Sequence, residues 1–130
     1  MQVIGSDDRP SALADPAQFT GRVWRTDLLT PPDTEHLAGV RFLYEPGARS
    51  HWHVHEREQV IIAVYGSGLV AWEGLAAPTS LGAGDWWHVR PGLPHWHGAT
   101  RTAAFAHLAV TAGGSTTWLH EVSEAEYLTR

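Results

Sequence analysis

Histidines at alternate positions between residues 51 and 55 have the spacing that carries the most chemistry. Alternate side chains of an extended strand share one face, so His51, His53 and His55 point the same way. Three imidazoles on one face are costly to bury without partners, and one metal ion would satisfy them together. Gln59 keeps the same parity at the start of the next apolar run, so its side-chain oxygen can converge on the same point. We therefore expect His53, His55 and Gln59 to bind a metal ion.

A second histidine cluster follows a Pro-Gly turn. His95 and His97 share one face of a predicted strand, and His107 lies on the next run, which is otherwise apolar. A lone histidine in an apolar run is usually a core residue. Here several other histidines point to the same interior, so a structural and a functional role for His107 both stay open.

Three further side chains are candidates to line the same pocket. His51 can lie at the mouth of the cavity or donate a hydrogen bond to a metal ligand. The face of His88 depends on whether the turn before His95 adds a bulge. Trp96 lies between the two histidines of the second cluster.

The elements that must position these residues are predicted to be strands. From Gly21 onward, short runs rich in branched and aromatic residues alternate with Gly/Pro turns, which is typical of a sandwich or barrel. Gly66-Ser67-Gly68 is one of these predicted turns. The predicted strands cover residues 22–28, 37–45, 50–55, 59–65, 69–73, 86–89, 95–99 and 103–110.

Only the two ends of the chain depart from this pattern. Residues 1–20 show no clear period and are predicted to be an irregular lead-in, followed by one domain over residues 21–130. Ser123 with Glu126 three residues later forms a capping-box pattern, which predicts a short helix through about Leu128. The sequence therefore predicts a single all-β domain with a short C-terminal helix.

Composition narrows the classes of function. The chain has 130 residues, with 43% hydrophobic and 18% charged residues, which suits a globular domain. It has no cysteine, which excludes thiolate metal sites and cysteine nucleophiles. A net charge of -5 with scattered arginines argues against a nucleic-acid partner. No apolar run is long enough to span a bilayer and no signal-peptide pattern opens the chain, so we expect a cytoplasmic protein that acts on a small molecule without a membrane partner.

Both histidine segments resemble the paired motifs of the cupin superfamily. The first motif reads G-x5-H-x-H-x3-E-x6-G, and Gly47, His53, His55, position 59 and Gly66 meet every spacing, with Gln in place of Glu. The second reads G-x5-P-x-G-x2-H-x3-N. It is met at Gly84, Gly92 and His95, with Arg90 at the first Pro and Ala99 at the Asn.

The first motif can also be placed in a second register. His51 and His53 with Glu58 also give two alternate histidines followed by an acid, but this register breaks the glycine spacings on both sides. We therefore rank it below the register that ends at Gln59.

Within the cupins, three strings resemble a small bacterial subgroup. EPGARSHWHVHEREQ, RPGLPHWHGAT and AAFAHLAV are similar to manganese-dependent hydroxynitrile lyases and to cupins grouped near carboxymuconolactone decarboxylases. The likeness runs from about Gly21 to the C-terminal helix. It implies a double-stranded β-helix, the jelly-roll barrel of cupins. Trp86, Trp87 and His88 are bulkier than the usual aliphatic stretch, so the resemblance does not carry over a substrate.

The resemblance also implies roles for individual residues. It adds His95 to His53, His55 and Gln59 as metal ligands, and it gives His97 and His107 a role in proton handling. The ion expected is Mn²⁺ or Fe²⁺, with Zn²⁺ or Ni²⁺ also compatible with this donor set. Small cupins commonly form dimers, so a homodimer is expected, with Trp24 and Trp118 as candidates for its interface.

Four neutral ligands would leave the full charge on a bound dication. This favours Lewis-acid chemistry over oxygen activation, with a histidine as general base. The leading hypothesis is a metal-dependent lyase for a small hydroxylated or carbonyl substrate, resembling a hydroxynitrile lyase. The alternatives are an iron-dependent dioxygenase, an isomerase or cyclase, and a cupin that binds a small molecule without catalysis.

Overall fold

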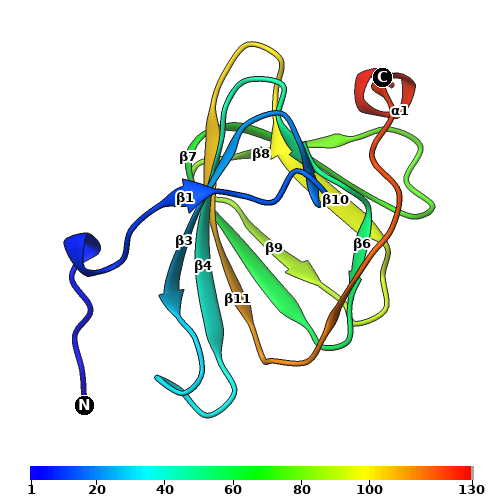
Figure 1. The fold of residues 1–130 in the computed structure, drawn as a ribbon. Helices are drawn as coiled ribbons and strands as arrows, with labels where there is room; N and C mark the ends of the chain where they lie inside the picture. The colour runs from blue at the N-terminus through cyan, green and yellow to red at the C-terminus, as the bar shows by residue number, and fades with distance from the viewer. Residues whose placement is uncertain (130) are drawn as a thin grey trace.

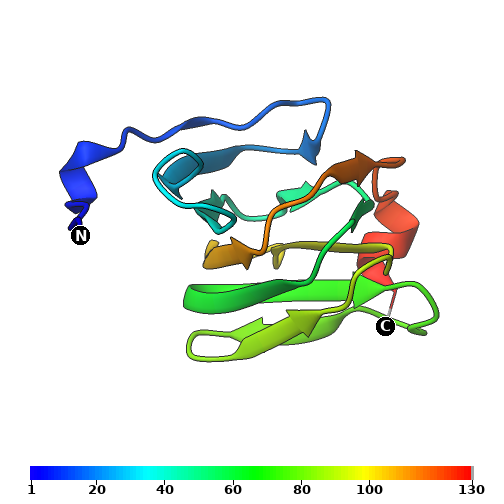
Figure 2. The same ribbon diagram turned by 90° about the horizontal axis from the view of Figure 1, so that it is seen from below.

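The long strand β7 (Gln59–Trp72) organises the fold because it belongs to two antiparallel sheets at once. Its first half pairs with β11 (Phe105–Thr111) and β9 (Trp86–Val89), and its second half pairs with β10 (His95–Ala99) and β8 (Thr79–Gly82). The computed structural model, which describes residues 1–129, shows these sheets curling around a common interior as a jelly-roll barrel (Figures 1 and 2).

The remaining strands extend the two sheets outward from β7. On one side β11 pairs with β4 (Ala38–Tyr44), β4 with β3 (Val23–Leu29), and β3 with β1 (Ala12–Leu13). On the other side β10 pairs with β5 (Arg49–Ser50) and β6 (His53–His55), β5 with β2 (Phe19–Thr20), and β6 with β12 (Thr116–Trp118).

The all-β class and the jelly-roll architecture are confirmed, whereas several predicted boundaries differ. The predicted turn at Gly66-Ser67-Gly68 is a bend inside β7, because Gly66 takes a φ of 78° and the strand continues into the second sheet. The predicted strand at 50–55 is divided into β5 and β6. Strands β8 and β12 were missed because their Thr-, Ser- and Gly-rich sequences carry little apolar pattern. The predicted irregular lead-in over residues 1–20 is wrong in part, because it contains the two-residue strands β1 and β2, which are too short to show a period.

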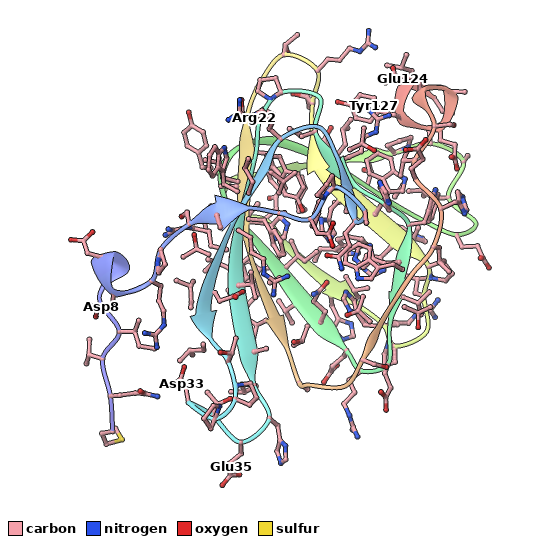
Figure 3. All side chains as sticks on the ribbon, in the orientation of Figure 1. Asp8, Arg22, Asp33, Glu35, Glu124 and Tyr127 are labelled. Atoms are coloured by element: carbon pink, nitrogen blue, oxygen red, sulfur yellow. The ribbon has the colours of Figure 1, made fainter. Side chains whose placement is uncertain are left out.

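The two ends of the chain lie outside the barrel. Residues before β1 lie outside the barrel and include the short 3-10 helix η1 (Ser6–Asp8), and Gln2 and Arg9 bond to Asp33 in the loop between β3 and β4 (Figure 1). The predicted C-terminal helix is confirmed as α1 (Glu124–Leu128), and Ser123 and Glu126 form the capping box. Glu124 and Tyr127 of α1 lie at the opposite end of the molecule from Asp33 and Glu35 (Figure 3). Within residues 1–129, no helix is long and apolar enough for a membrane span.

The core lies between the two sheets and is rich in aromatic rings. Its main cluster of buried side chains includes Phe19, Tyr44, Ile61 and Phe105. Phe105 needs room beside β7, and a Cβ at Gly68 would lie 2.6 Å from its ring. Five of the histidines, His53, His55, His95, His97 and His107, are buried in this same interior, so the core and the candidate site share one space.

Candidate metal centre

The two histidine motifs meet because β6 and β10 are neighbouring antiparallel strands. His53 is the register partner of His95, which places residues 42 positions apart in the chain directly opposite each other. The ring centroids of His53 and His95 lie 4.2 Å apart. His55 joins them, with its ring 5.0 Å from that of His53 and 5.1 Å from that of His95. The structure thus brings three predicted ligands into mutual contact.

Backbone carbonyls fix which ring nitrogen carries the proton in two of these histidines. Nδ1 of His53 lies 2.8 Å from the carbonyl oxygen of His51, and Nδ1 of His95 lies 2.8 Å from that of Leu93. A carbonyl oxygen only accepts, so each Nδ1 is the donor in the neutral ring. Each Nε2 is therefore left as a bare lone pair, the form in which imidazole binds a metal.

Several buried side-chain nitrogen and oxygen atoms in this region, all able to bind a metal ion, have no hydrogen-bond partner. They are Nε2 of His55, Oε1 of Gln59 and Nε2 of His95, and in addition Nδ1 of His107 behind Tyr44. Buried polar atoms are normally hydrogen-bonded, and leaving one unpaired costs about 1–3 kcal/mol. Three such atoms among neighbouring residues fit a site built to receive a cation.

A second possible group of ligands has His97 in place of His55. His53, His95 and His97 each offer a ring nitrogen, and these three atoms lie within 4.8 Å of one another. Nδ1 of His97 lies 2.6 Å from the hydroxyl of Tyr44, so the nitrogen that His97 can offer is Nε2, as in His53 and His95. The unpaired donor atoms favour His55 and Gln59 as companions of His53 and His95, with His97 beside them.

Tyr44 connects two histidines across the barrel. Its hydroxyl lies 2.6 Å from Nδ1 of His97 on β10 and 3.1 Å from Nε2 of His107 on β11. Tyr44 and His107 are fully buried, and their rings stack with centroids 5.5 Å apart. Burial raises the pKa of the Tyr44 phenol well above its usual value, so the group is a neutral hydroxyl.

The buried histidines are neutral near pH 7 in the absence of a metal. Burial, together with the neighbouring His95, holds the pKa of His53 well below its usual value. Burial and the nearby His107 do the same for His97. Burial lowers the pKa of His95 to about 4 and that of His107 to about 4. Neutral imidazoles suit metal binding and can accept a proton.

A cavity of about 230 Å³ opens beside these residues. Its polar wall includes His53, His55, Gln59 and His97. Its apolar wall and rim include aromatic, aliphatic and threonine side chains: Phe19, Ala38, Val40, Phe42, Ala109, Thr111, Thr116 and Trp118. Among the described residues that line it, Arg25 is the only one with a formally charged side chain.

Three predicted pocket residues lie elsewhere. The side chain of His88 points outward from β9 and pairs with Glu58 at 2.7 Å, with 57% of it exposed. Trp96 has the opposite parity to His95 and His97, so it faces away from the cavity and packs against Tyr127 of α1. His51 precedes β6 and is half-buried, and its contribution is the backbone oxygen that holds His53.

The two tryptophans suggested for a dimer interface take different positions. Trp24 lies on the outer face of the sheet and donates through Nε1 to Glu45 at 3.1 Å. Trp118 instead lines the cavity and lies against His53, with ring centroids 4.7 Å apart. Trp118 is thus part of the site.

Sequence reasoning missed Tyr44, Phe42 and Arg25. All three alternate along β4 or β3 on the face toward the barrel interior, a parity that could have been read from the strand pattern. No spacing in the sequence links Tyr44 to His97 or His107, because the partners lie 53 and 63 residues away. The packing of the two sheets decides these contacts.

Comparison with known proteins places the chain among cupins. Residues 40–111 match the family described as Cupin domain. The chain is 38% identical to an (R)-mandelonitrile lyase from Granulicella tundricola, with 95% of each chain covered. It is similar to the crystal structure of a cupin-like protein from Thermotoga maritima, with a TM-score of 0.85, 30% identity, and 98% and 93% of the two chains covered. A polyketide cyclase from Streptomyces resistomycificus shares the fold at a TM-score of 0.80 and 19% identity, with 98% and 90% covered.

Proposed function

Since the chain belongs to the cupin family, we propose that its histidine pocket holds a divalent metal ion and that the protein is a metal-dependent lyase for a small hydroxylated or carbonyl compound. In its narrow form, the proposed activity is cleavage of a cyanohydrin, as the name of the relative from Granulicella tundricola states for that protein. The observation that carries the proposal is the convergence of buried, unpaired donor atoms beside a cavity that also contains a further histidine.

The residues proposed to hold the ion are His53, His55, Gln59 and His95. Backbone acceptors leave Nε2 of His53 and His95 bare, and Nε2 of His55 and Oε1 of Gln59 are without partners. This set is neutral, so a bound Mn²⁺ or Fe²⁺ would keep its full charge. Such an ion supplies Lewis acidity, which lowers the pKa of a substrate hydroxyl or polarises a carbonyl.

His97 is the residue proposed to move the proton. It lines the cavity, its Nδ1 is held by Tyr44, and its Nε2 remains for the substrate. In cyanohydrin cleavage Nε2 takes the hydroxyl proton, the C–CN bond breaks, and cyanide leaves with the bonding electron pair. The imidazolium of His97 then returns the proton to give hydrogen cyanide and an aldehyde. His107 lies behind Tyr44 and contributes through that hydroxyl.

The cavity suits a compact substrate with an apolar body. Its volume of about 230 Å³ accommodates a single ring with a short substituent. Phe42, Phe19 and Trp118 supply a wall against which such a ring packs. The polar functional group then lies toward the histidines.

Cleavage of mandelonitrile by Mn²⁺-loaded protein tests the narrow proposal. Formation of benzaldehyde is followed by absorbance, and we expect a His53→Ala variant to lose the activity together with the metal. A His88→Ala variant is the matched control, because His88 pairs with Glu58 on the outside of the barrel. Activity no greater than that of His53→Ala would contradict the narrow proposal.

Two measurements separate the other candidate functions. Oxygen uptake by Fe²⁺-loaded protein with diketones or phenols would favour an iron-dependent dioxygenase. Elemental analysis of the purified protein distinguishes a metal-dependent protein from a cupin that binds a small molecule alone. We expect one divalent ion per chain, since the unpaired donors are costly without it.

A further inference from the structure

The hydroxyl of Tyr44 is the only hydrogen-bond partner that the described structure shows for the buried nitrogens Nδ1 of His97 and Nε2 of His107. A phenol has one proton to donate, so it cannot donate to both rings. If both rings donated to it, the phenol proton itself would have no partner. The arrangement that satisfies all three atoms has one ring donating to Tyr44 and the other accepting from it.

The other pocket histidines indicate the direction of this chain. Nδ1 of His53 and of His95 each donates to a backbone carbonyl, and Nδ1 of His55 lies 3.1 Å from Oγ1 of Thr116. Each of these three histidines therefore has Nδ1 against an oxygen, whereas Nδ1 of His107 has no partner among the described residues. His97 continues this pattern with the oxygen of Tyr44.

We propose that Tyr44 is a positioning residue that holds His97 with its proton on Nδ1 and a bare lone pair on Nε2. In this arrangement His97 donates to the oxygen of Tyr44, and Tyr44 donates to Nε2 of His107. The hydrogen bond to His97 crosses from β4 to β10, so it also fixes the ring relative to the opposite sheet. This assignment deepens the proposed function, because a base needs the lone pair on the nitrogen that faces the substrate.

The tautomer can be measured directly in the metal-free protein. Long-range ¹H–¹⁵N spectra of protein labelled at histidine distinguish a protonated Nδ1 from a protonated Nε2. For wild-type protein near pH 7.5 we expect His97 with the proton on Nδ1. A proton on Nε2 of His97 would overturn the proposal, whatever the activity of the metal-loaded protein.

Two variants test the direction of the hydrogen-bond chain. In Tyr44→Phe the acceptor is lost, and we expect the Nδ1 form of His97 to give way to a mixture of tautomers. In His107→Leu the Tyr44 proton has no acceptor on His107, so it turns to His97 and drives the proton of that ring to Nε2. An unchanged tautomer in both variants would overturn the proposal.

Kinetics supply an independent readout. We expect Tyr44→Phe to lower kcat by about 10- to 100-fold with little change in KM, as is typical when a partner that orients a functional histidine is removed. Tyr65→Phe is the matched control, since Tyr65 lies on β7 with 61% of its surface exposed. A loss of similar size in Tyr65→Phe, or none in Tyr44→Phe, would contradict the role. If the protein has no lyase activity, the tautomer measurement still decides.

A separate observation concerns the charge of the cavity, and it rests on the proposed metal site. Arg25 lines the cavity and lies opposite Phe42, with its guanidinium carbon 5.6 Å from the centre of that ring. Its Nε donates to Asp27 at 2.8 Å, which uses one of the five N–H groups of the guanidinium. No carboxylate lines the cavity among the described residues, so a bound dication would make it positive, while the charge of Arg25 is offset in part by its ion pair with Asp27.

We infer that the substrate carries a carboxylate on its apolar body and that Arg25 binds this group at the mouth. A planar guanidinium matches a carboxylate through paired hydrogen bonds. The ring of the substrate would pack on Phe42 and Trp118, between the carboxylate and the histidines.

Binding of phenylacetate against phenylacetamide tests this inference. Both are titrated into metal-free protein with tryptophan fluorescence as the readout, because Trp118 lines the cavity. We expect phenylacetate to bind at least about tenfold more tightly than the neutral amide, as hydrogen bonds to charged groups allow. Arg25→Gln should abolish this preference. Arg22→Gln should keep it, since that arginine is 63% exposed and pairs with Glu45.

The outcomes are distinct from those of the metal proposal. A preference that survives in Arg25→Gln, or no preference in the wild type, would overturn the role of Arg25. Because the titration uses metal-free protein, its outcome does not depend on whether the proposed metal site is correct. Repeating it with Mn²⁺ present then shows whether the carboxylate binds Arg25 or the ion, since only the first depends on Arg25.

Discussion

At the scale of single residues, position 59 decides how much charge the proposed metal pocket keeps. The sequence has an amide where the related motif has a carboxylate, and the structure leaves the amide oxygen buried without a partner. A neutral ligand does not offset the charge of a dication, whereas a carboxylate offsets one unit. Gln59 therefore favours a strong Lewis acid at some loss of affinity for the ion.

Gln59→Glu is expected to raise the affinity for the metal ion and to lower its Lewis acidity. We expect Mn²⁺ to bind about tenfold more tightly, a gain of about 1.4 kcal/mol, while cleavage of mandelonitrile slows. The metal-free variant should be less stable than wild type, because it buries an unpaired charge. Calorimetric titration with Mn²⁺ gives the affinity. Equal affinities of Gln59→Glu and wild type would contradict the placement of residue 59 at the ion.

The histidine spacings predicted which donors come together, but not what holds them. His53, His55 and His95 could be inferred because alternation within a strand and the paired motifs are local patterns. Tyr44 could not, since its hydroxyl meets His97 and His107 only after two sheets pack. Residue types and parity are properties of the sequence, whereas contacts across the barrel depend on its curvature.

At the scale of elements, the close approach of β10 to β5 helps to position the histidines that β10 carries. Gly98 makes this approach possible, since a Cβ there would lie 2.5 Å from the carbonyl oxygen of Ala48 and 2.5 Å from Cβ of Arg49. The same strand carries His95 and His97 on its inner face. The close packing of β10 against β5 therefore fixes the positions of His95 and His97 relative to the other strands.

Gly98→Ala should be strongly destabilising compared with a similar change in another strand. We expect a loss of about 1–3 kcal/mol, because the added methyl group must displace β5 or β10. Gly39→Ala in β4 is the matched control, since its nearest contact would be Cβ of Leu29 at 3.8 Å. Urea denaturation of the metal-free variants measures both. Equal midpoints for the two variants would contradict this account of β10.

The path of β7 shows what strand prediction from sequence cannot resolve. Its two apolar runs were predicted as separate strands because Gly66 and Gly68 flank a serine, a typical turn signal. In the structure these glycines allow a bend and the close approach of Phe105, and the strand continues into the second sheet. The same residues favour a turn or a bend, and the pairing of β7 with β10 decides between them.

At the scale of the whole molecule, burying several neutral histidines makes the stability of the metal-free protein depend on pH. Histidine in an unfolded chain has a pKa near 6.5, whereas burial lowers the pKa of His95 and His107 to about 4. Between these values the unfolded chain binds more protons than the folded one. Stability is therefore fully present above about pH 6.5 and is lost as the pH falls toward 4.

We expect the metal-free protein to lose about 1.4 kcal/mol per pH unit for each such histidine between about pH 6.5 and 5. Urea unfolding at about pH 7.5, 6.5 and 5.5 measures how the free energy of unfolding changes with pH. His107→Leu should show a shallower slope, because one buried titrating group is gone. A slope that matches the wild type would mean that His107 is not held neutral by burial.

Metal binding should stabilise the whole barrel because the donors come from separate elements. His53 and His55 lie on β6, Gln59 begins β7 and His95 lies on β10, so one ion would join three strands. An ion that binds only the folded state at about 100 times its Kd adds about 2.7 kcal/mol of stability. For a domain of this size, that raises Tm by about 10 °C.

Differential scanning fluorimetry with Mn²⁺, and with EDTA as the reference, measures the shift. His95→Ala should lose it and the exposed His88→Ala should keep it, since only His95 contributes a donor. A full shift in His95→Ala would place the ion elsewhere in the molecule.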